Sequence, residues 1–254
     1  MISMGRSRYH ADRTDRTDRT DPTADLTIGA RFCGPARSGN DGYTAGSLAE
    51  RMPTGGLGPV VEVTLRLPPP LDTPMQVRRD APVTVLFHDG ARVAEARESD
   101  TGLEPVDPVP AGVAADAMSR FPGLVHHPFP TCYACGTARA EGDGLRIFPG
   151  QVGETQMAAL WVPHERVGVG TTWAALDCIG GWAGDMEERK MVLGRMTAQL
   201  DALPVVGEPH VVVGRGLGHQ GRKTFTASTL YDSDGTIVAR ARQVWIAVDP
   251  DAFN

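Results

Sequence analysis

Two cysteines and two histidines stand close together in the middle of the chain and offer ligands for a metal. Cys132-Tyr-Ala-Cys135 has the C-x2-C spacing, and His126 and His127 precede it. Thiolate and imidazole are ligands that Zn²⁺ prefers. Two adjacent histidines cannot readily reach one tetrahedral ion, however, and the sequence contains no second C-x2-C. A thioredoxin-like role would need a parallel βαβ unit, which does not accompany this motif. We therefore expect no metal here.

A glycine-rich segment near the carboxyl end also has a chemically suggestive spacing. Gly216-Leu-Gly218-His-Gln-Gly221 matches the G-x-G-x-x-G of dinucleotide-binding loops and follows the apolar residues 211–213. In such loops the glycines open a helix whose N-terminus holds the pyrophosphate. Residues 224–231 instead alternate between polar and apolar, which is typical of a strand. We expect no nicotinamide cofactor, and no other cofactor.

Composition and charge limit the class of protein. The chain has 254 residues, 41% of them hydrophobic, with 25 Lys and Arg against 31 Asp and Glu, for a net charge of -6. This length allows one large domain or two small ones. The acidic balance argues against nucleic acid as the main partner. No run of 18 apolar residues and no apolar segment behind the amino-terminal basic residues occurs, so we expect no membrane span and a cytoplasmic location.

The amino-terminal region repeats a polar triplet. Residues 12–23 read Asp-Arg-Thr three times and then Asp-Pro-Thr, without a large apolar side chain. Such a segment cannot offset its ordering entropy by burial. We predict a disordered tail over residues 1–26, with folding beginning near Leu26.

A longer repeat indicates two similar halves. Asp89-Gly90-Ala-Arg-Val-Ala-Glu-Ala-Arg recurs 145 residues later as Asp234-Gly235-Thr-Ile-Val-Ala-Arg-Ala-Arg. Each copy is an Asp-Gly turn followed by an alternating strand and preceded by another strand, at residues 83–87 and 224–231. Asp-Gly between alternating segments is a strong hairpin signal. Both copies are therefore predicted to be β-hairpins.

The elements before each hairpin occur in the same order. A short helix of small residues (43–50, then 172–178) is followed by an alternating strand (60–67, then 192–200) and a proline-rich turn. Further strands are predicted at 75–78 and 209–213. The sequence thus predicts an α+β protein in which each half is a curved antiparallel sheet around one central helix.

The predicted domain boundaries follow from this order. The N-terminal half covers residues 27–99 and the C-terminal half residues 131–254. A proline-rich linker, residues 100–130, separates them and includes a short helix at 113–121.

One helix wrapped by an antiparallel sheet, used twice, resembles the double hotdog fold, and the chain is similar to the acyl-CoA thioesterase II family. In that family the second hotdog carries an Asp in its central helix, a Thr on the next strand and a Gln on the last strand. Asp177, Thr197 and Gln243 occupy these positions. Gly42-Tyr-Thr-Ala-Gly46 resembles the glycine-rich start of the family's first helix. The similarity extends from about residue 32 to residue 248.

Two segments depart from the family pattern. The loop that carries a basic patch in the family's first hotdog is short here, reduced to residues 78–82. Residues 132–145, with the C-x2-C motif, instead resemble a cysteine-rich opening of some small single-hotdog thioesterases.

The resemblance implies hydrolysis of acyl-CoA thioesters to free acid and CoA by a water that Asp177 activates. Burial of a carboxylate among apolar residues raises its pKa and makes it a better base. Thr197 and Gln243 would hold the water as neutral hydrogen-bonding groups. Cys178, next to Asp177, is a conceivable nucleophile, but a small cysteine in a helix is more often part of the core.

Substrate-binding groups are expected at two further places. Backbone N–H groups of Gly42 and Tyr43, at a helix start, would bind the oxyanion. Asn40 and Asp41 precede them and are of the residue types that cap helix N-termini. The alternative is that Asn40 or Asp41 takes part in catalysis at the junction of the two halves. Arg222 and Lys223, in a loop between two strands, are candidates for the CoA phosphates.

Two other functions stay open from the sequence. The first is an acyl-CoA or acyl-carrier binding module with the same fold and no hydrolysis, since a fold does not fix function. The second is a hotdog hydratase or dehydratase, for which His164 and His219 are the available histidines, although neither lies in a recognisable hydratase motif. A homodimer is expected from the resemblance alone.

Overall fold

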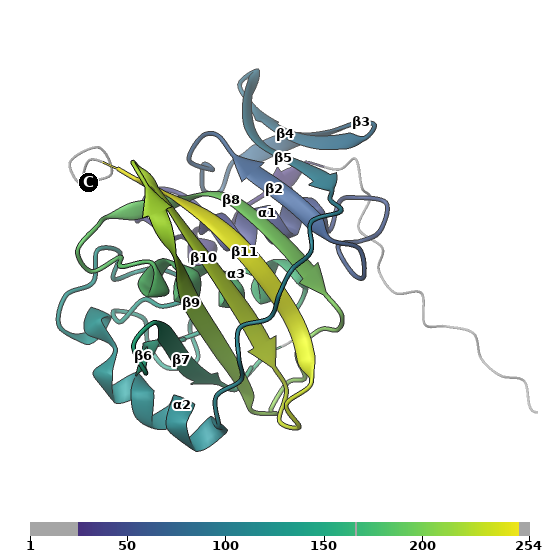
Figure 1. Cartoon of the computed structure of the whole chain (residues 1–254). Coiled ribbons are helices and arrows are strands. Elements are labelled where there is room, and N and C mark those ends of the chain that lie inside the picture. The colour runs from purple at the N-terminus through teal and green to yellow at the C-terminus, as the bar shows by residue number, and fades with distance from the viewer. Residues whose placement is uncertain (1–24, 166, 249–254) are drawn as a thin grey trace, which may run out of the picture.

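A single large antiparallel sheet is the framework of the molecule (Figure 1). The computed structural model describes residues 25–248 except residue 166. Eleven of the described segments form strands in the spatial order β1-β3-β4-β5-β2-β8-β11-β10-β9-β7-β6, and all of these strand pairs are antiparallel. The predicted tail lies outside the described residues up to residue 24. The first strand, β1 (Leu26–Thr27), begins where folding was expected to begin.

The N-terminal half contains the helix α1 and four neighbouring strands in the order β3-β4-β5-β2, of which β3, β4 and β5 form a meander. The Asp89-Gly90 turn between β4 and β5 has φ angles of 46° and 77°, the left-handed conformation that a two-residue hairpin turn requires. The predicted hairpin is therefore confirmed. The elements are α1 (Asp41–Ala49), β2 (Val61–Leu65), β3 (Pro74–Asp80), β4 (Val83–His88) and β5 (Ala91–Glu98).

The C-terminal half has a longer helix and longer strands. The Asp234-Gly235 hairpin is confirmed, and the glycine-rich segment 216–221 lies in β9 and its turn, followed by a strand as predicted. The central helix is about twice as long as the predicted helix over 172–178, because it begins at Val169 and continues through Gly180 and Gly181 to Ala183. A Cβ would lie 2.9 Å from Gln243 at Gly180 and 2.5 Å from Met186 at Gly181. The elements are β6 (Gly150–Val152), β7 (Gln156–Trp161), α3 (Val169–Ala183), β8 (Met191–Leu200), β9 (His210–Gln220), β10 (Lys223–Tyr231) and β11 (Ile237–Ala247).

The connector between the halves is pinned to the sheet. It crosses in front of β10 and β11 in Figure 1 and then forms α2 (Ala111–Ala117), close to the predicted helix. The backbone N–H of Val106 donates to Thr229 Oγ1 at 2.9 Å, and the Tyr231 hydroxyl donates to the Val106 carbonyl. The division into 27–99, 100–130 and 131–254 stays a prediction.

A strand pairing and a helix pairing join the halves. Strand β2 pairs with β8, with Val63 opposite Met196, so that the sheet continues from one half into the other. Helices α1 and α3 also pack side by side, and they are in close contact at Gly46. A Cβ on Gly46 would lie 2.7 Å from Trp173 Cβ and 2.8 Å from Gly170 Cα, so only glycine permits this approach. In the described part of the chain, no helix combines the length and the apolar character that crossing a bilayer requires.

Candidate active site

The start of α1 holds a carboxylate of α3. Asn40 is the N-cap of α1: its backbone is extended and its Oδ1 accepts a hydrogen bond from Tyr43 N at 2.7 Å. The Asn40 amide Nδ2 donates to Asp177 Oδ2 at 3.2 Å, and Gly42 N donates to the same oxygen at 3.0 Å. The positive end of the α1 dipole thus faces the Asp177 carboxylate.

Asp177 is buried with one oxygen free. Only 2% of the residue is exposed, and Oδ1 has no hydrogen-bond partner within the described structure. The carboxylate fits there because Gly42 lacks a side chain, since a Cβ at that position would lie 2.4 Å from Asp177 Cβ. Burial raises the pKa of Asp177 well above its ordinary value, and the nearby charges of Asp41 and Cys132 raise it further. Asp177 therefore accepts a proton more readily than an exposed carboxylate.

A second carboxylate lies on the same side of α1. Asp41 Oδ2 accepts a hydrogen bond from Leu193 N, on β8, at 3.2 Å. Burial raises the pKa of Asp41 to about 7. The sequence indicated Asp41 as a capping residue, but Asn40 is the cap, and the Asp41 side chain instead reaches across to the C-terminal half.

Three thiols lie beside Asp177. The Sγ atoms of Cys132, Cys135 and Cys178 are within 4.8 Å of one another, and those of Cys132 and Cys178 are 3.5 Å apart. All three cysteines are buried, as expected for Cys178. Together with Asn40 and Asp177 they line a cavity of about 30 Å³, which is large enough for a water molecule.

The histidines next to the C-x2-C motif are differently placed. His126 is exposed. His127 lines the cavity, but its Nδ1 accepts from Phe129 N at 3.0 Å and its Nε2 lies 3.1 Å from the Cys135 carbonyl oxygen. Both ring nitrogens thus have backbone partners.

A larger pocket adjoins the small cavity. It has a volume of about 210 Å³ and shares Pro35, Asp41 and Val192 with the small cavity. Its lining includes apolar side chains of β2, β8 and β11, and it lies at the junction of the two halves. Arg66 is the cation among the lining residues. The larger pocket therefore meets the small cavity on the Asp41 side.

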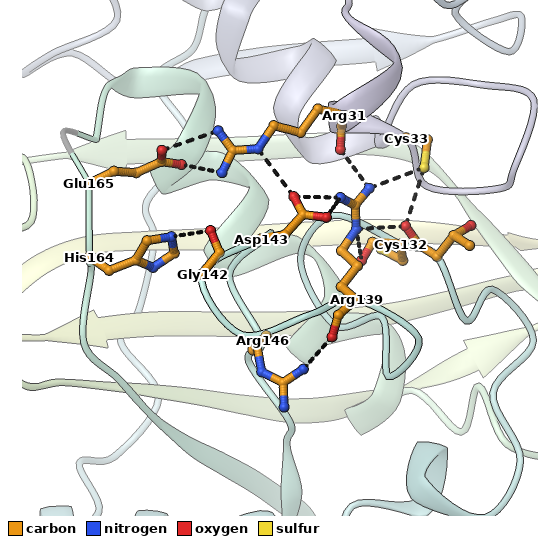
Figure 2. Close-up of polar contacts among 10 residues, drawn as sticks. Arg31, Cys33, Cys132, Arg139, Gly142, Asp143, Arg146, His164 and Glu165 are labelled. Atoms are coloured by element: carbon orange, nitrogen blue, oxygen red, sulfur yellow. Dashed lines mark hydrogen bonds and ion pairs between the residues drawn. The ribbon is translucent and has the colours of Figure 1, made fainter.

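Figure 2 shows how the cysteine-containing loop is fixed to the N-terminal segment. The Arg139 guanidinium donates to the carbonyls of Cys132 and Arg31, to Cys33 Sγ at 3.3 Å, and to both carboxylate oxygens of Asp143. The Arg139 side chain is only 8% exposed, so these charge-assisted bonds form in a mostly dry environment. Nearby, Arg31 forms a two-bond ion pair with Glu165.

The structure does not bring Thr197 to Asp177. Thr197 lies opposite Arg242 in the β8–β11 ladder, whereas the preceding residue, Met196, lies opposite Gln243. Residues opposite each other point to the same face of a sheet, and successive residues point to opposite faces. Because Gln243 faces α3, Thr197 faces away from it.

Gln243 is buried under α3 and fully bonded to protein groups. Its Oε1 accepts from Thr226 Oγ1 at 2.9 Å, and its Nε2 donates to the Leu176 carbonyl at 3.0 Å and to Ser228 Oγ at 2.6 Å. Only 1% of the residue is exposed. These bonds tie α3 to β10 and β11, and Gln243 does not line the small cavity.

The other predicted positions are also placed by the structure. The N–H groups of Gly42 and Tyr43 already bond to Asp177 Oδ2 and Asn40 Oδ1. Arg222 and Lys223 are exposed in the β9–β10 turn, and Lys223 lies opposite Ile246, which lines the larger pocket.

The two histidines of the hydratase alternative are exposed. His164 Nε2 lies 2.9 Å from the Gly142 carbonyl oxygen, and His219 lies on β9. Neither residue lines the small cavity beside Asp177.

Comparison with known proteins places this arrangement among solved folds. A TesB protein from Mycobacterium avium subspecies paratuberculosis is similar in structure, with a TM-score of 0.60 and 14% identity over 91% of this chain and 96% of that one. A conserved hot dog fold protein of unknown function from Alicyclobacillus acidocaldarius has the same TM-score and identity, over 91% and 97% of the two chains. This chain has a hotdog fold.

An acyl-CoA thioesterase II, TesB2 from Mycobacterium marinum, is also similar, with a TM-score of 0.53 and 10% identity over 90% of this chain and 94% of that one. The predicted resemblance is therefore confirmed at the level of the fold. No family model and no curated protein sequence matches the chain.

Proposed function

We propose that this hotdog protein hydrolyses acyl-CoA thioesters to free acid and CoA, within a tandem arrangement of two hotdogs. The observation that carries the proposal is the free Oδ1 of Asp177, a buried carboxylate oxygen at the edge of a cavity large enough for a water molecule. Solved proteins of similar fold that are named TesB and acyl-CoA thioesterase II support the choice of substrate.

In the proposed reaction, Asp177 Oδ1 takes a proton from the water while the water oxygen attacks the thioester carbonyl. The tetrahedral intermediate then collapses, the C–S bond breaks, and the proton passes from Asp177 to the departing CoA thiolate. The Asn40 amide holds Oδ2, so the carboxylate keeps its orientation through the cycle. Thioester and water are thus converted to carboxylic acid and thiol without any other reactant.

Stabilising the oxyanion requires an exchange of hydrogen bonds at the start of α1. Gly42 N must release Asp177 Oδ2 to bind the thioester oxygen, and the Asn40 amide then remains as the donor that holds the carboxylate. The tetrahedral oxyanion carries more charge than the ground-state carbonyl, so this donor is most effective in the transition state. Tyr43 N stays bonded to the cap.

The larger pocket is the proposed path for the substrate. Its volume of about 210 Å³ is below the roughly 300–1,000 Å³ of common ligand pockets, which favours a narrow, extended chain. Arg66 in its lining and Lys223 opposite Ile246 offer positive charge for the CoA phosphates. Arg222 lies next to Lys223 in the same turn.

The test is release of free thiol from short, medium and long acyl-CoAs by the wild type and by Asp177→Asn. Asp116→Asn, an exposed carboxylate on α2, is the matched control. We expect turnover by the wild type and the control, and a loss of about 100-fold or more in Asp177→Asn.

Two outcomes would count against the proposal. Full turnover by Asp177→Asn would remove Asp177 as the base. No turnover of any ester by the folded wild type would favour the binding module, to be tested by equilibrium binding of the same esters.

A further inference from the structure

The three clustered thiols have the spacing of metal ligands. With Zn–S bonds of about 2.3 Å, sulfur ligands of a tetrahedral ion lie about 3.8 Å apart. The Sγ atoms of Cys132 and Cys178 are 3.5 Å apart, and all three Sγ atoms lie within 4.8 Å of one another. An ion therefore needs only small side-chain movements to bind all three.

An amide donor already points at the thiol cluster. The Asn40 Nδ2 group donates to Cys132 Sγ at 3.7 Å. The turn is closed by Gly136 N, which donates to the Cys132 carbonyl at 2.8 Å. Donors aimed at a thiolate are the surroundings that a metal-bound cysteine needs.

The third thiol comes from the central helix, 43 residues after Cys135. Cys178 also lies 4.0 Å from the Asn40 amide. A disulfide would involve only two of the three clustered sulfur atoms, whereas one thiophilic metal ion can bind all three. This difference favours metal binding over a redox pair.

A fourth position is available next to Asp177. The cavity of about 30 Å³ is lined by all three cysteines and by Asp177, whose Oδ1 has no hydrogen-bond partner within the described structure. Three protein ligands with one position left for water is the pattern of reactive rather than purely structural zinc sites. The cavity has room for such a water.

We propose that Cys132, Cys135 and Cys178 bind one thiophilic divalent metal ion, such as Zn²⁺, with a fourth position open toward Asp177. Binding replaces the thiol protons with metal–sulfur bonds and releases these protons to solvent, without any transfer of electrons. The site shares Asp177 with the proposed reaction, but metal content and uptake are measured without reference to thioester hydrolysis, so the two proposals can fail separately. The structure brings Cys178 to the motif, where the sequence had offered only histidines.

The first test measures metal content and uptake in the full chain. Protein from zinc-supplemented cells is analysed by mass spectrometry for metal, then stripped with chelator under reducing conditions and titrated with Co²⁺. We expect one Zn²⁺ per chain, and a thiolate-to-cobalt charge-transfer band that saturates at one Co²⁺ and is displaced by Zn²⁺. Neither measurement requires a variant to fold.

The second test locates the ligands. Cys178→Ser and Cys135→Ser should each weaken Co²⁺ binding by about 10-fold or more. Cys33→Ser is the matched control, because Cys33 lies outside the cluster and a serine hydroxyl can still accept from Arg139 and donate to the Thr131 carbonyl. This variant should bind as the wild type does. Circular dichroism of the metal-free proteins checks that each variant is folded.

Three results would overturn the proposal. They are a reduced wild type that binds neither ion, a folded Cys178→Ser variant with unchanged affinity, and a Cys132–Cys178 disulfide in protein purified under reducing conditions. The last result would assign the cluster to redox chemistry.

Discussion

Replacing Gln243 with alanine separates an anchoring role from a water-orienting one. The change removes three hydrogen bonds, those with Thr226 Oγ1, Ser228 Oγ and the Leu176 carbonyl. At about 1 kcal/mol net for each bond, the unfolding free energy should fall by about 3 kcal/mol. Two of the partners keep other bonds, because Ser228 Oγ still donates to the Leu176 carbonyl and Thr226 Oγ1 still accepts from Trp245 Nε1, so a much larger loss is not expected.

The assay is urea unfolding followed by tryptophan fluorescence, together with thiol release at a temperature where the variant is folded. For a chain of this size the loss corresponds to a decrease in melting temperature of about 6–12 °C. Turnover should stay within a few-fold of wild type, since Gln243 does not line the cavity at Asp177. Gln199→Ala, on the adjacent strand β8, is the control and should cost less than about 1 kcal/mol because Gln199 is only partly buried. If Gln243→Ala lost more than about 100-fold in turnover and kept the stability of the wild type, the anchoring role would be refuted and Gln243 would be assigned a catalytic role.

Three further predictions follow from the packing and charges around the two helices. Thr197→Val should change turnover by less than about two-fold in the thiol-release assay, because Thr197 faces away from α3; a large loss would show that this face contributes to the site. Gly46→Ala should lower the unfolding free energy by about 1–2 kcal/mol in urea, since overlap with Trp173 outweighs the gain of about 1 kcal/mol in helix propensity; a more stable variant would contradict the close helix contact. The folded state raises the pKa of Asp41 from 3.8 to about 7 and so binds more protons than the unfolded state between these values. The unfolding free energy of the wild type should therefore fall as pH rises from about 4 to about 7, and Asp41→Asn should remove this part of the slope, as urea titrations across that range would show.

The hairpin strands of the sheet were predictable because their signals are local, whereas β6 and β7 were not predicted. Asp89-Gly90 forms a two-residue turn with both φ angles positive, and Asp234-Gly235 lies in the loop 232–236, where Gly235 has a φ of 80°. The alternation of the flanking strands is visible along the chain. The full length of α3 was not predictable, because Gly180 and Gly181 look like helix breakers. In the structure both glycines pack closely, since a Cβ would lie 2.9 Å from Gln243 at Gly180 and 2.5 Å from Met186 at Gly181, and this contact between distant parts of the chain is not visible in local propensity.

The candidate site was only partly predictable. Asp177 was identified through the resemblance, but the groups that hold it, Asn40 and Gly42, stand more than 130 residues away and could be read only as a helix start. Thr197 illustrates a second limit. Successive residues of a strand point to opposite faces of the sheet, and a resemblance based on a few separated positions does not determine which of two neighbouring residues faces α3. The proximity of Cys178 to the C-x2-C motif is likewise a product of the folded chain.

The starts of helices α1 and α3 meet different groups, and this difference bears on the number of substrate sites in each chain. The start of α1 meets the Asp177 carboxylate, whereas the start of α3, at Gly170, meets Ser47 and Tyr43. Two identical subunits related by a twofold axis would present every such contact twice. In this single polypeptide α3 supplies the carboxylate, while Asn40 and Gly42 at the start of α1 supply its donors. We therefore expect one substrate to saturate each chain, so that a titration reaches its end point at equal amounts of ligand and protein.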